Sequence, residues 1–228
     1  MWDFPLLPLP CLGFPFLSLA LLAVTLLVVH LTFVGDGSMI VAEIKLSSKP
    51  GSPFSPSRYH EEPKLTKELP DAYEQRTWRN KCHFDANTKQ AYIPGTMVKK
   101  SVETAASMKA ERIPGRGVST YTKHFVSGII IEGQIDLGVT IDKCEGVRLY
   151  QNADGKRGGS KRVMRHFPIF PKWSGTLTLY VVDSILTRDV VERHLVEAGI
   201  LVGLGRWRPA VGGMNGRFDA KILKWEER

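Results

Sequence analysis

The chain has 228 residues and a formal net charge of +8 at pH 7, with 31 Lys and Arg residues against 23 Asp and Glu residues. This length allows one large domain or two small ones, and the basic excess points to a polyanionic partner, nucleic acid ahead of an anionic membrane surface. Three cysteines (Cys11, Cys82 and Cys144) are a sparse and odd set, which argues against a secreted disulfide framework and favours a reducing, cytoplasmic compartment.

The first 38 residues differ from the rest because they contain no Lys or Arg. Residues 17–34 read LSLALLAVTLLVVHLTFV, which is just long enough for a membrane span, and the positive-inside rule then places the basic remainder in the cytoplasm. The opening MWDF lacks the basic start of a signal peptide. Three interpretations stay open: an extension upstream of a natural start at Met39, a membrane anchor, or a cleaved signal.

From Met39 onward the pattern predicts strands and helices in alternation. A helix from about Thr96 to Ala110 is predicted because its apolar residues recur on one face. A second helix starts after Thr187, a favourable N-cap, and is closed by Gly199. The Pro-, Ser- and charge-rich stretch 47–80 is predicted as a long loop that orders on binding, or as an insertion. The predicted strands span residues 40–46, 128–132, 147–150, 175–186 and 218–225.

The second predicted helix runs into a glycine tract that contains arginines and a tryptophan, GLGRWRPAVGGMNGRF at residues 203–218. Glycine allows close approach of a backbone to a ligand, arginine suits phosphate, and tryptophan offers a stacking face. The tract is therefore a candidate nucleic-acid-binding loop, and a glycine-rich hairpin with solvated arginines is the structural alternative. Its candidate binding residues are Gly205, Arg206, Trp207, Arg208, Gly212, Gly213, Gly216 and Arg217.

Three further segments are candidates for phosphate contacts. Gly95 and Thr96 open the first helix, where free backbone N–H groups stabilise an anion, and Lys99 and Lys100 lie one turn inside. The segment GKRGGSKRVMRH has no carboxylate nearby in the sequence, and a segment around residues 112–125 interleaves basic and aromatic residues. Solvated charges are the alternative for each. The candidates in the last two segments are Lys156, Arg157, Lys161, Arg162, Arg165, Arg116 and Lys123.

Two motifs in this order carry a resemblance to a known family. AYIPGTMVKKSV at 91–102 resembles the "IPGSSLKG" segment that opens the first helix of the RAMP superfamily, the repeat-associated proteins that form the backbone of CRISPR effector complexes. The glycine tract resembles the C-terminal glycine-rich loop of those proteins. The predicted order strand, helix, strand, strand, helix, strand is that of an α+β, ferredoxin-like β-α-β-β-α-β core, and the resemblance supports it. This core lies within residues 39–228, with insertions at about 47–84 and 111–174. A stand-alone or phage-encoded relative is implied as readily as an effector subunit.

Motifs for catalysis, metal or cofactor binding are missing from the sequence: the histidines lack metal-ligand spacing, and no nucleotide-binding or nucleophile motif occurs. The sequence therefore favours non-catalytic binding of single-stranded nucleic acid, RNA ahead of DNA. The resemblance implies side-by-side assembly, as a homo-oligomer or as a subunit of a nucleoprotein complex. Two alternatives remain: an RNA-cleaving relative, for which Asp85 is the candidate catalytic residue, and a phage structural or membrane-tethered protein that uses its basic face for protein or lipid contact.

Overall fold

The computed structural model describes residues 39–152 and 161–228, which fall in one compact unit. The N-terminal segment 1–38, with its predicted apolar stretch, lies outside the described residues. Within the described part of the chain, no helix has both the length and the apolar character needed to cross a membrane.

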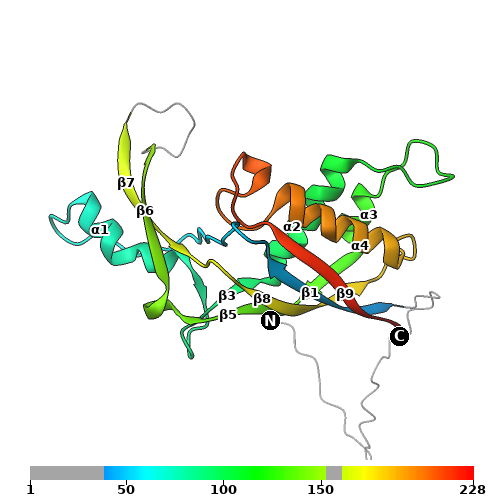
Figure 1. The fold of residues 1–228 in the computed structure, drawn as a ribbon, viewed down its shortest axis with the longest axis horizontal. Helices are drawn as coiled ribbons and strands as arrows, with labels where there is room; N and C mark the ends of the chain where they lie inside the picture. The colour runs from blue at the N-terminus through cyan, green and yellow to red at the C-terminus, as the bar shows by residue number, and fades with distance from the viewer. Residues whose placement is uncertain (1–38, 153–160) are drawn as a thin grey trace, which may run out of the picture. The chain divides into compact units, whose positions relative to one another are not determined.

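The main sheet has four antiparallel strands in the order β4-β8-β1-β9 (Figure 1). Along the chain, the elements of this core follow one another as strand, helix, strand, strand, helix, strand, and the first strand lies between the third and the fourth. This is the topology of a ferredoxin-like α+β fold, so the predicted fold class is confirmed. The core elements are β1 (Ile40–Ser48), α2 (Gly95–Lys109), β4 (Ile129–Glu132), β8 (Ser174–Val181), α4 (Arg188–Glu197) and β9 (Phe218–Glu227).

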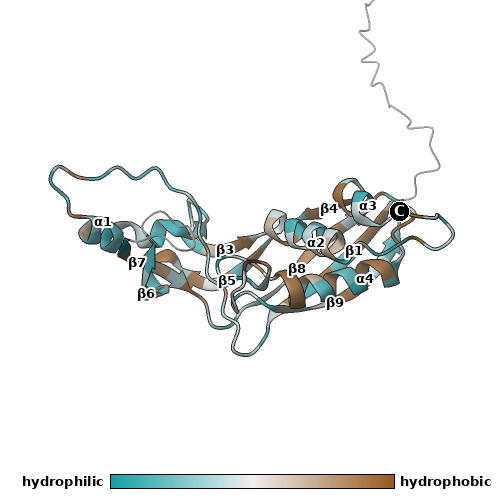
Figure 2. Ribbon diagram, turned by 90° about the horizontal axis from the view of Figure 1, so that it is seen from above, coloured by the Kyte–Doolittle hydropathy of each residue, from teal (hydrophilic) through white to brown (hydrophobic). Residues whose placement is uncertain are grey.

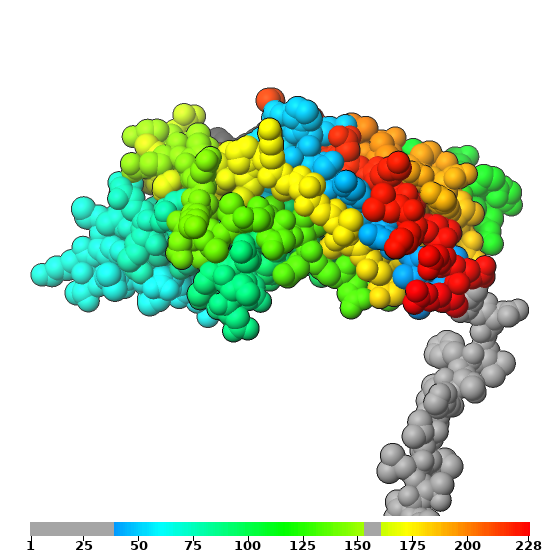
Figure 3. Space-filling view, turned by 60° about the horizontal axis from the view of Figure 1, so that its bottom comes forward, coloured from blue at the N-terminus to red at the C-terminus, as the bar shows by residue number. Residues whose placement is uncertain are grey.

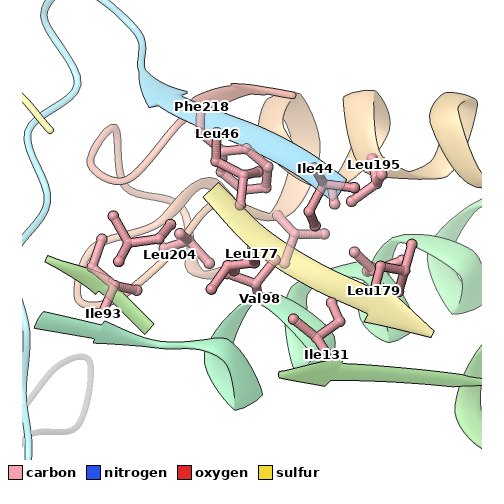
Figure 4. Close-up of a cluster of buried hydrophobic side chains, with 14 of the residues drawn as sticks. Ile44, Leu46, Ile93, Val98, Ile131, Leu177, Leu179, Leu195, Leu204 and Phe218 are labelled. Atoms are coloured by element: carbon pink, nitrogen blue, oxygen red, sulfur yellow. The ribbon is translucent and has the colours of Figure 1, made fainter. Parts of the chain in front are cut away.

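The helices α2 and α4 cover one face of this sheet, and the core lies between them and the strands (Figures 1 and 4). Alternation along β1 turns Ala42, Ile44 and Leu46 toward the helices, where all three are buried. The predicted apolar face of α2 is buried as well, including Val98. Leu204, from the glycine tract, also enters this core and therefore anchors the tract to it.

Insertions build the remaining elements. The predicted insertions at 47–84 and 111–174 both contain such elements, and the second range also includes the core strand β4. In Figure 2 the loop that leads into α1 is mainly hydrophilic, whereas the strands of the main sheet carry hydrophobic residues. A smaller sheet has the order β2-β3-β5, and β6 and β7 form a hairpin. The elements are α1 (Pro70–Thr77), η1 (Trp78–Lys81), β2 (His83–Phe84), β3 (Gln90–Pro94), α3 (Thr122–Ser127), β5 (Gln134–Thr140), η2 (Ile141–Lys143), β6 (Glu145–Asn152), β7 (Arg162–Ile169), η3 (Ala198–Val202) and η4 (Pro209–Val211).

Three local predictions need correction. The stretch 47–80 is an insertion with its own helical elements rather than one long loop, since α1 and most of η1 lie in it. The strand predicted to reach residue 186 ends at Val181, and a turn follows in which the Asp183 carboxylate accepts the Ile185 N–H at 3.0 Å. The second helix does not close at Gly199 but continues through the π-helical turn η3. Glycine is needed at 199 because a Cβ there would overlap the carbonyl oxygen of Phe218.

Candidate nucleic-acid interface

A cleft of about 630 Å³ lies between α2 and the glycine tract. It brings together five candidate binding residues from two segments of the sequence, Lys100 from α2 and Gly205, Arg206, Trp207 and Arg208 from the tract. Among its described lining residues there is no Asp or Glu, so the cleft presents positive charge without a carboxylate. The lining residues are Ser57, His83, Met97, Lys100, Ser101, Thr104, Gln151, Val202, Gly203, Gly205, Arg206, Trp207, Arg208 and Val211.

The glycines of the tract allow its backbone segments to pack closely against one another. A Cβ on Gly213 would overlap the carbonyl oxygen of Trp207, and one on Gly216 would overlap that of Leu204. Gly205, Gly212 and Gly216 also have φ between +72° and +79°, a conformation that disfavours a side chain. The space that each Cβ of Gly205, Gly213 and Gly216 would take is filled by this chain's own atoms. The interpretation that these three glycines keep a surface clear for a ligand is therefore wrong.

Arg206 is a half-buried residue held in place by aromatic rings. Its guanidinium lies 3.5 Å from the centroid of Phe167 and 4.6 Å from that of Trp207, and it donates a hydrogen bond to the side-chain oxygen of Gln151 on β6. Burial lowers the pKa of Arg206 to about 10, and the charge of Arg165 adds to the effect. The group remains charged at neutral pH and forms a fixed wall of the cleft.

Arg208 and Arg217 differ in where they lie. Arg208 lines the cleft and donates from Nη1 to the Gly205 carbonyl at 3.2 Å. Arg217 lies outside the lining and donates to two backbone carbonyls, those of Ile200 at 3.3 Å and Met214 at 3.5 Å. Arg217 thus ties the tract to η3.

The start of α2 differs from its predicted role. The Gly95 N–H is not free, because it donates to the Gly133 carbonyl at 3.0 Å, and Gly95 is buried. Thr96 is exposed. Lys99 and Lys100 share one carboxylate, with Nζ of each 3.6 and 3.2 Å from Glu103. Of the two lysines, only Lys100 lines the cleft.

The hairpin arginine Arg165 has a partner far away in the sequence. Its Nη1 lies 2.9 Å from Glu74 of α1, which also accepts from Lys81 at 2.6 Å. The sequence offers this segment no carboxylate nearby along the chain, and the fold supplies one from a distant helix. Lys161 and Arg162 are exposed and do not line the cleft. Lys156 and Arg157 lie outside the described residues.

The remaining candidates lie elsewhere. Arg116 and Lys123 are exposed near α3, which is held to the turn after β8 by a 2.6 Å contact between His124 Nδ1 and Asp183. Asp85 closes a turn by accepting the N–H groups of residues 87 and 88, and hydrogen bonds from the Thr88 backbone and hydroxyl keep its pKa low. In the described residues, no group of three or more His, Cys, Asp or Glu side chains is arranged to hold a metal ion.

The sequence did not predict the residues that the insertions contribute to the lining of the cleft. Ser57, His83 and Gln151 line the cleft, and Phe167 stacks on Arg206 from behind. Burial lowers the pKa of His83, and the nearby Arg58 charge adds to it, so its imidazole is neutral at pH 7. No local motif marks these residues, because they meet the tract only through tertiary contacts.

No protein-family model matches the chain, and no curated protein matches it. A solved structure, described as "Cryo-EM structure of the Type III-B Cmr-beta bound to cognate target RNA", contains a chain that is similar at 15% sequence identity and a TM-score of 0.42. The alignment covers 83% of this chain and 61% of that chain, less than two thirds of its length. The fold assignment above rests on the strand order and not on this likeness.

Proposed function

We propose that residues 39–228 bind single-stranded nucleic acid, with RNA as the expected ligand, in the cleft between α2 and the glycine tract. One observation carries the proposal: Lys100, Arg206 and Arg208 converge beside Trp207 in a cleft whose described lining has no carboxylate. Cations bind phosphates and an indole face stacks on any base, which together give affinity with little sequence preference. A volume of about 630 Å³ also falls in the usual range of small-ligand sites.

The opposite face of the main sheet is a poorer site for a polyanion. Figure 3 shows β9, β1 and β8 side by side on this face without a helix over them. Its groups include the carboxylates Glu43, paired with Lys224 at 3.2 Å, and Glu132, which accepts the Tyr180 hydroxyl at 2.6 Å. These carboxylates stand among lysines of the same face, such as Lys45 opposite Lys221, so this face mixes charges of both signs, whereas the described lining of the cleft has no carboxylate. The proposal therefore places the nucleic acid on the side of the sheet that the helices cover. In the proposed assembly, neighbouring copies of this chain or other subunits bind along the same nucleic-acid strand.

Neither alternative function gains support from the described residues. Asp85 forms a turn and does not line the cleft, so we assign no RNA cleavage to that residue. Membrane attachment through residues 17–34 stays a prediction of the sequence, since that segment lies outside the described residues.

Neutralising the cleft is expected to weaken binding more than neutralising an equal charge elsewhere. Lys100→Gln and Arg208→Gln should each reduce the affinity for single-stranded RNA about tenfold, the value of one lost charge-assisted hydrogen bond. Lys221→Gln, on β9 and outside the cleft lining, removes the same charge and should cost less than about twofold. Fluorescence titration of the full chain with a labelled oligonucleotide measures these affinities.

The same titration tests the electrostatic basis of binding. Wild-type affinity should fall by orders of magnitude between about 50 and 200 mM salt, and each cleft variant should have a shallower salt slope than the wild type. Equal losses of RNA affinity for all three variants would show that the binding site does not lie in the cleft. Salt-insensitive binding, or no binding to RNA and DNA alike, would refute the proposed function.

A further inference from the structure

A second pocket, of about 590 Å³, lies outside the lining of the proposed cleft. The five residues 58–62 line it, together with Asn80 of η1 and Phe84 of β2. Its volume falls in the usual range of small-ligand sites. The pocket is therefore large enough to hold one nucleotide.

The segment that lines this pocket is fixed at both ends. At its start, the Arg58 N–H donates to the Lys81 carbonyl at 2.8 Å. At its end, the Glu62 carboxylate accepts Arg76 Nη1 at 2.8 Å, and the Glu62 carbonyl accepts the Tyr73 hydroxyl at 2.7 Å, both from α1. These contacts hold the wall of the pocket in place without a ligand, which lowers the entropic cost of binding one.

Three polar side chains in the pocket have no hydrogen-bond or ion-pair partner among the described residues. They are the Glu61 carboxylate, the Asn80 amide and the His60 imidazole, whose Nδ1 is also buried. A buried polar atom without a partner costs free energy that a ligand or an ordered water can recover. The pocket thus offers hydrogen-bonding groups that the fold itself does not use.

Planar groups line the same pocket. The Tyr59 side chain is 81% exposed, and the guanidinium of Arg58 lies 5.5 Å from the centroid of the Phe84 ring. Unstacked bases stack on aromatic rings and on arginine guanidinium planes. Planar surfaces beside unused donors and acceptors are the combination that recognises a nucleobase.

We propose that this pocket binds a guanine base, with the Glu61 carboxylate as the group that selects it. The Watson–Crick edge of guanine carries two neighbouring donors, N1–H and the N2 amino group, and an ionised carboxylate accepts both at once. Adenine and cytosine offer one amino group beside an acceptor nitrogen, and uracil offers one N–H between two carbonyl oxygens. In the proposed complex the Asn80 amide supplies the donor for guanine O6.

The pocket adjoins the proposed cleft along the chain. Ser57 and His83 line the cleft, and the residues that follow them, Arg58 and Phe84, line the pocket. A strand bound in the cleft can therefore place one base in the pocket, and in that case the inference rests on the proposed function and adds a base preference to it. A free guanine nucleotide presents the same chemistry, so the experiment has an arm for each source.

The first arm uses RNA. The full chain is titrated with labelled oligonucleotides of about ten nucleotides, one of uridine only, one with a single central guanosine and one with a single central adenosine. The guanosine should raise the affinity roughly tenfold, and the adenosine should not. Glu61→Gln should remove this gain and leave the affinity for the uridine strand within about twofold. Glu145→Gln is the matched control, because Glu145 is exposed at the start of β6, outside the pocket, and this variant should keep the gain.

The second arm uses free nucleotides and does not depend on the cleft. Isothermal titration calorimetry compares guanosine monophosphate with adenosine monophosphate on the wild type, Glu61→Gln and Glu145→Gln. A guanine preference in either arm that Glu61→Gln removes and Glu145→Gln keeps supports the site, and the arm that shows it identifies the source.

Equal affinities for guanine and adenine in both arms, or equal losses in Glu61→Gln and Glu145→Gln, would overturn the proposal. These results are distinct from a failure of the proposed function. Uridine RNA that binds without any guanine preference refutes the pocket alone, whereas guanosine monophosphate that binds when no RNA does refutes the cleft alone.

Discussion

Glu74→Gln is expected to destabilise the protein by about 3–5 kcal/mol, the usual cost of breaking a buried ion pair by removing one partner. Glu74 accepts Lys81 Nζ at 2.6 Å, Arg165 Nη1 at 2.9 Å and the His166 N–H at 3.3 Å. The side chains of Glu74 and Lys81 are only 10% and 11% exposed. Without the carboxylate, the ammonium of Lys81 stays buried and uncompensated. Urea unfolding followed by circular dichroism measures the loss.

Asp71→Asn is the matched control, because it removes a carboxylate from the same helix. Asp71 pairs with Arg148 at 3.2 Å, with both side chains about half exposed, so a much smaller loss is expected. Adding Lys81→Met to Glu74→Gln should restore much of the stability, since the buried charge goes with it. Equal losses for Glu74→Gln and Asp71→Asn, or no rescue by the second substitution, would contradict this account of the cluster.

The pH dependence of stability follows from the same carboxylate. Burial alone would raise the pKa of Glu74, but the hydrogen bond and charge of Lys81 outweigh it, with help from His166 and Arg165, and the pKa lies below its ordinary value. A lowered pKa in the folded state stabilises the protein above the ordinary carboxyl pKa, and this contribution is lost as the pH falls through the folded value. In Glu74→Gln the free energy of unfolding should therefore fall less steeply as the pH is lowered into the acid range than it does in the wild type.

Gly213→Ala is expected to cost about 3 kcal/mol or more, although it adds a single methyl group. The new Cβ would overlap the carbonyl oxygen of Trp207, and a backbone atom cannot swing away as a side chain would. The turn that positions Trp207 must then open, so binding of single-stranded RNA should fall together with stability. Urea unfolding and the fluorescence titration measure the two effects.

Gly138→Ala is the control that separates the effect of a steric overlap from the effect of a positive φ. Gly138 has φ +72°, and no heavy atom lies within 4 Å of the place that a Cβ would take, so only the strain of a left-handed residue, about 1–2 kcal/mol, is expected. RNA affinity should be unchanged there because Gly138 lies on β5, outside the cleft lining. A Gly213→Ala protein as stable as Gly138→Ala would show that the tract rearranges freely and that its glycines are not needed for packing.

The core of the fold was predictable from the sequence because it depends on local periodicity. The apolar spacing that includes Val98 and Val102 predicted α2, and the alternation of apolar and polar residues predicted the central strand β8. These patterns are repeated at each turn or every second residue, and they report which face is buried. The order of the elements then restricted the topology to the ferredoxin-like one.

The site was only partly predictable, because its organisation depends on contacts between distant segments. The sequence drew attention to Lys100, Arg206 and Arg208 as ligand contacts, which stays a prediction, and it assigned Arg165 to the ligand although Glu74 holds it from α1. It also took the glycines as a surface for a ligand, whereas their neighbours are this chain's own carbonyls. Pairings across many tens of residues leave no periodic signal in the sequence.

Photochemical cross-linking tests the central claim most directly, because it reports which residues lie beside a bound base. Single-stranded RNA that contains 4-thiouridine would be irradiated with the full chain, and the cross-linked peptides identified by mass spectrometry. The proposed site predicts adducts on Trp207 and on the cleft side of α2 between Met97 and Thr104. Adducts confined to the opposite face of the sheet, around Tyr180 and Glu43, or to the hairpin residues Lys161 and Arg162, would contradict it.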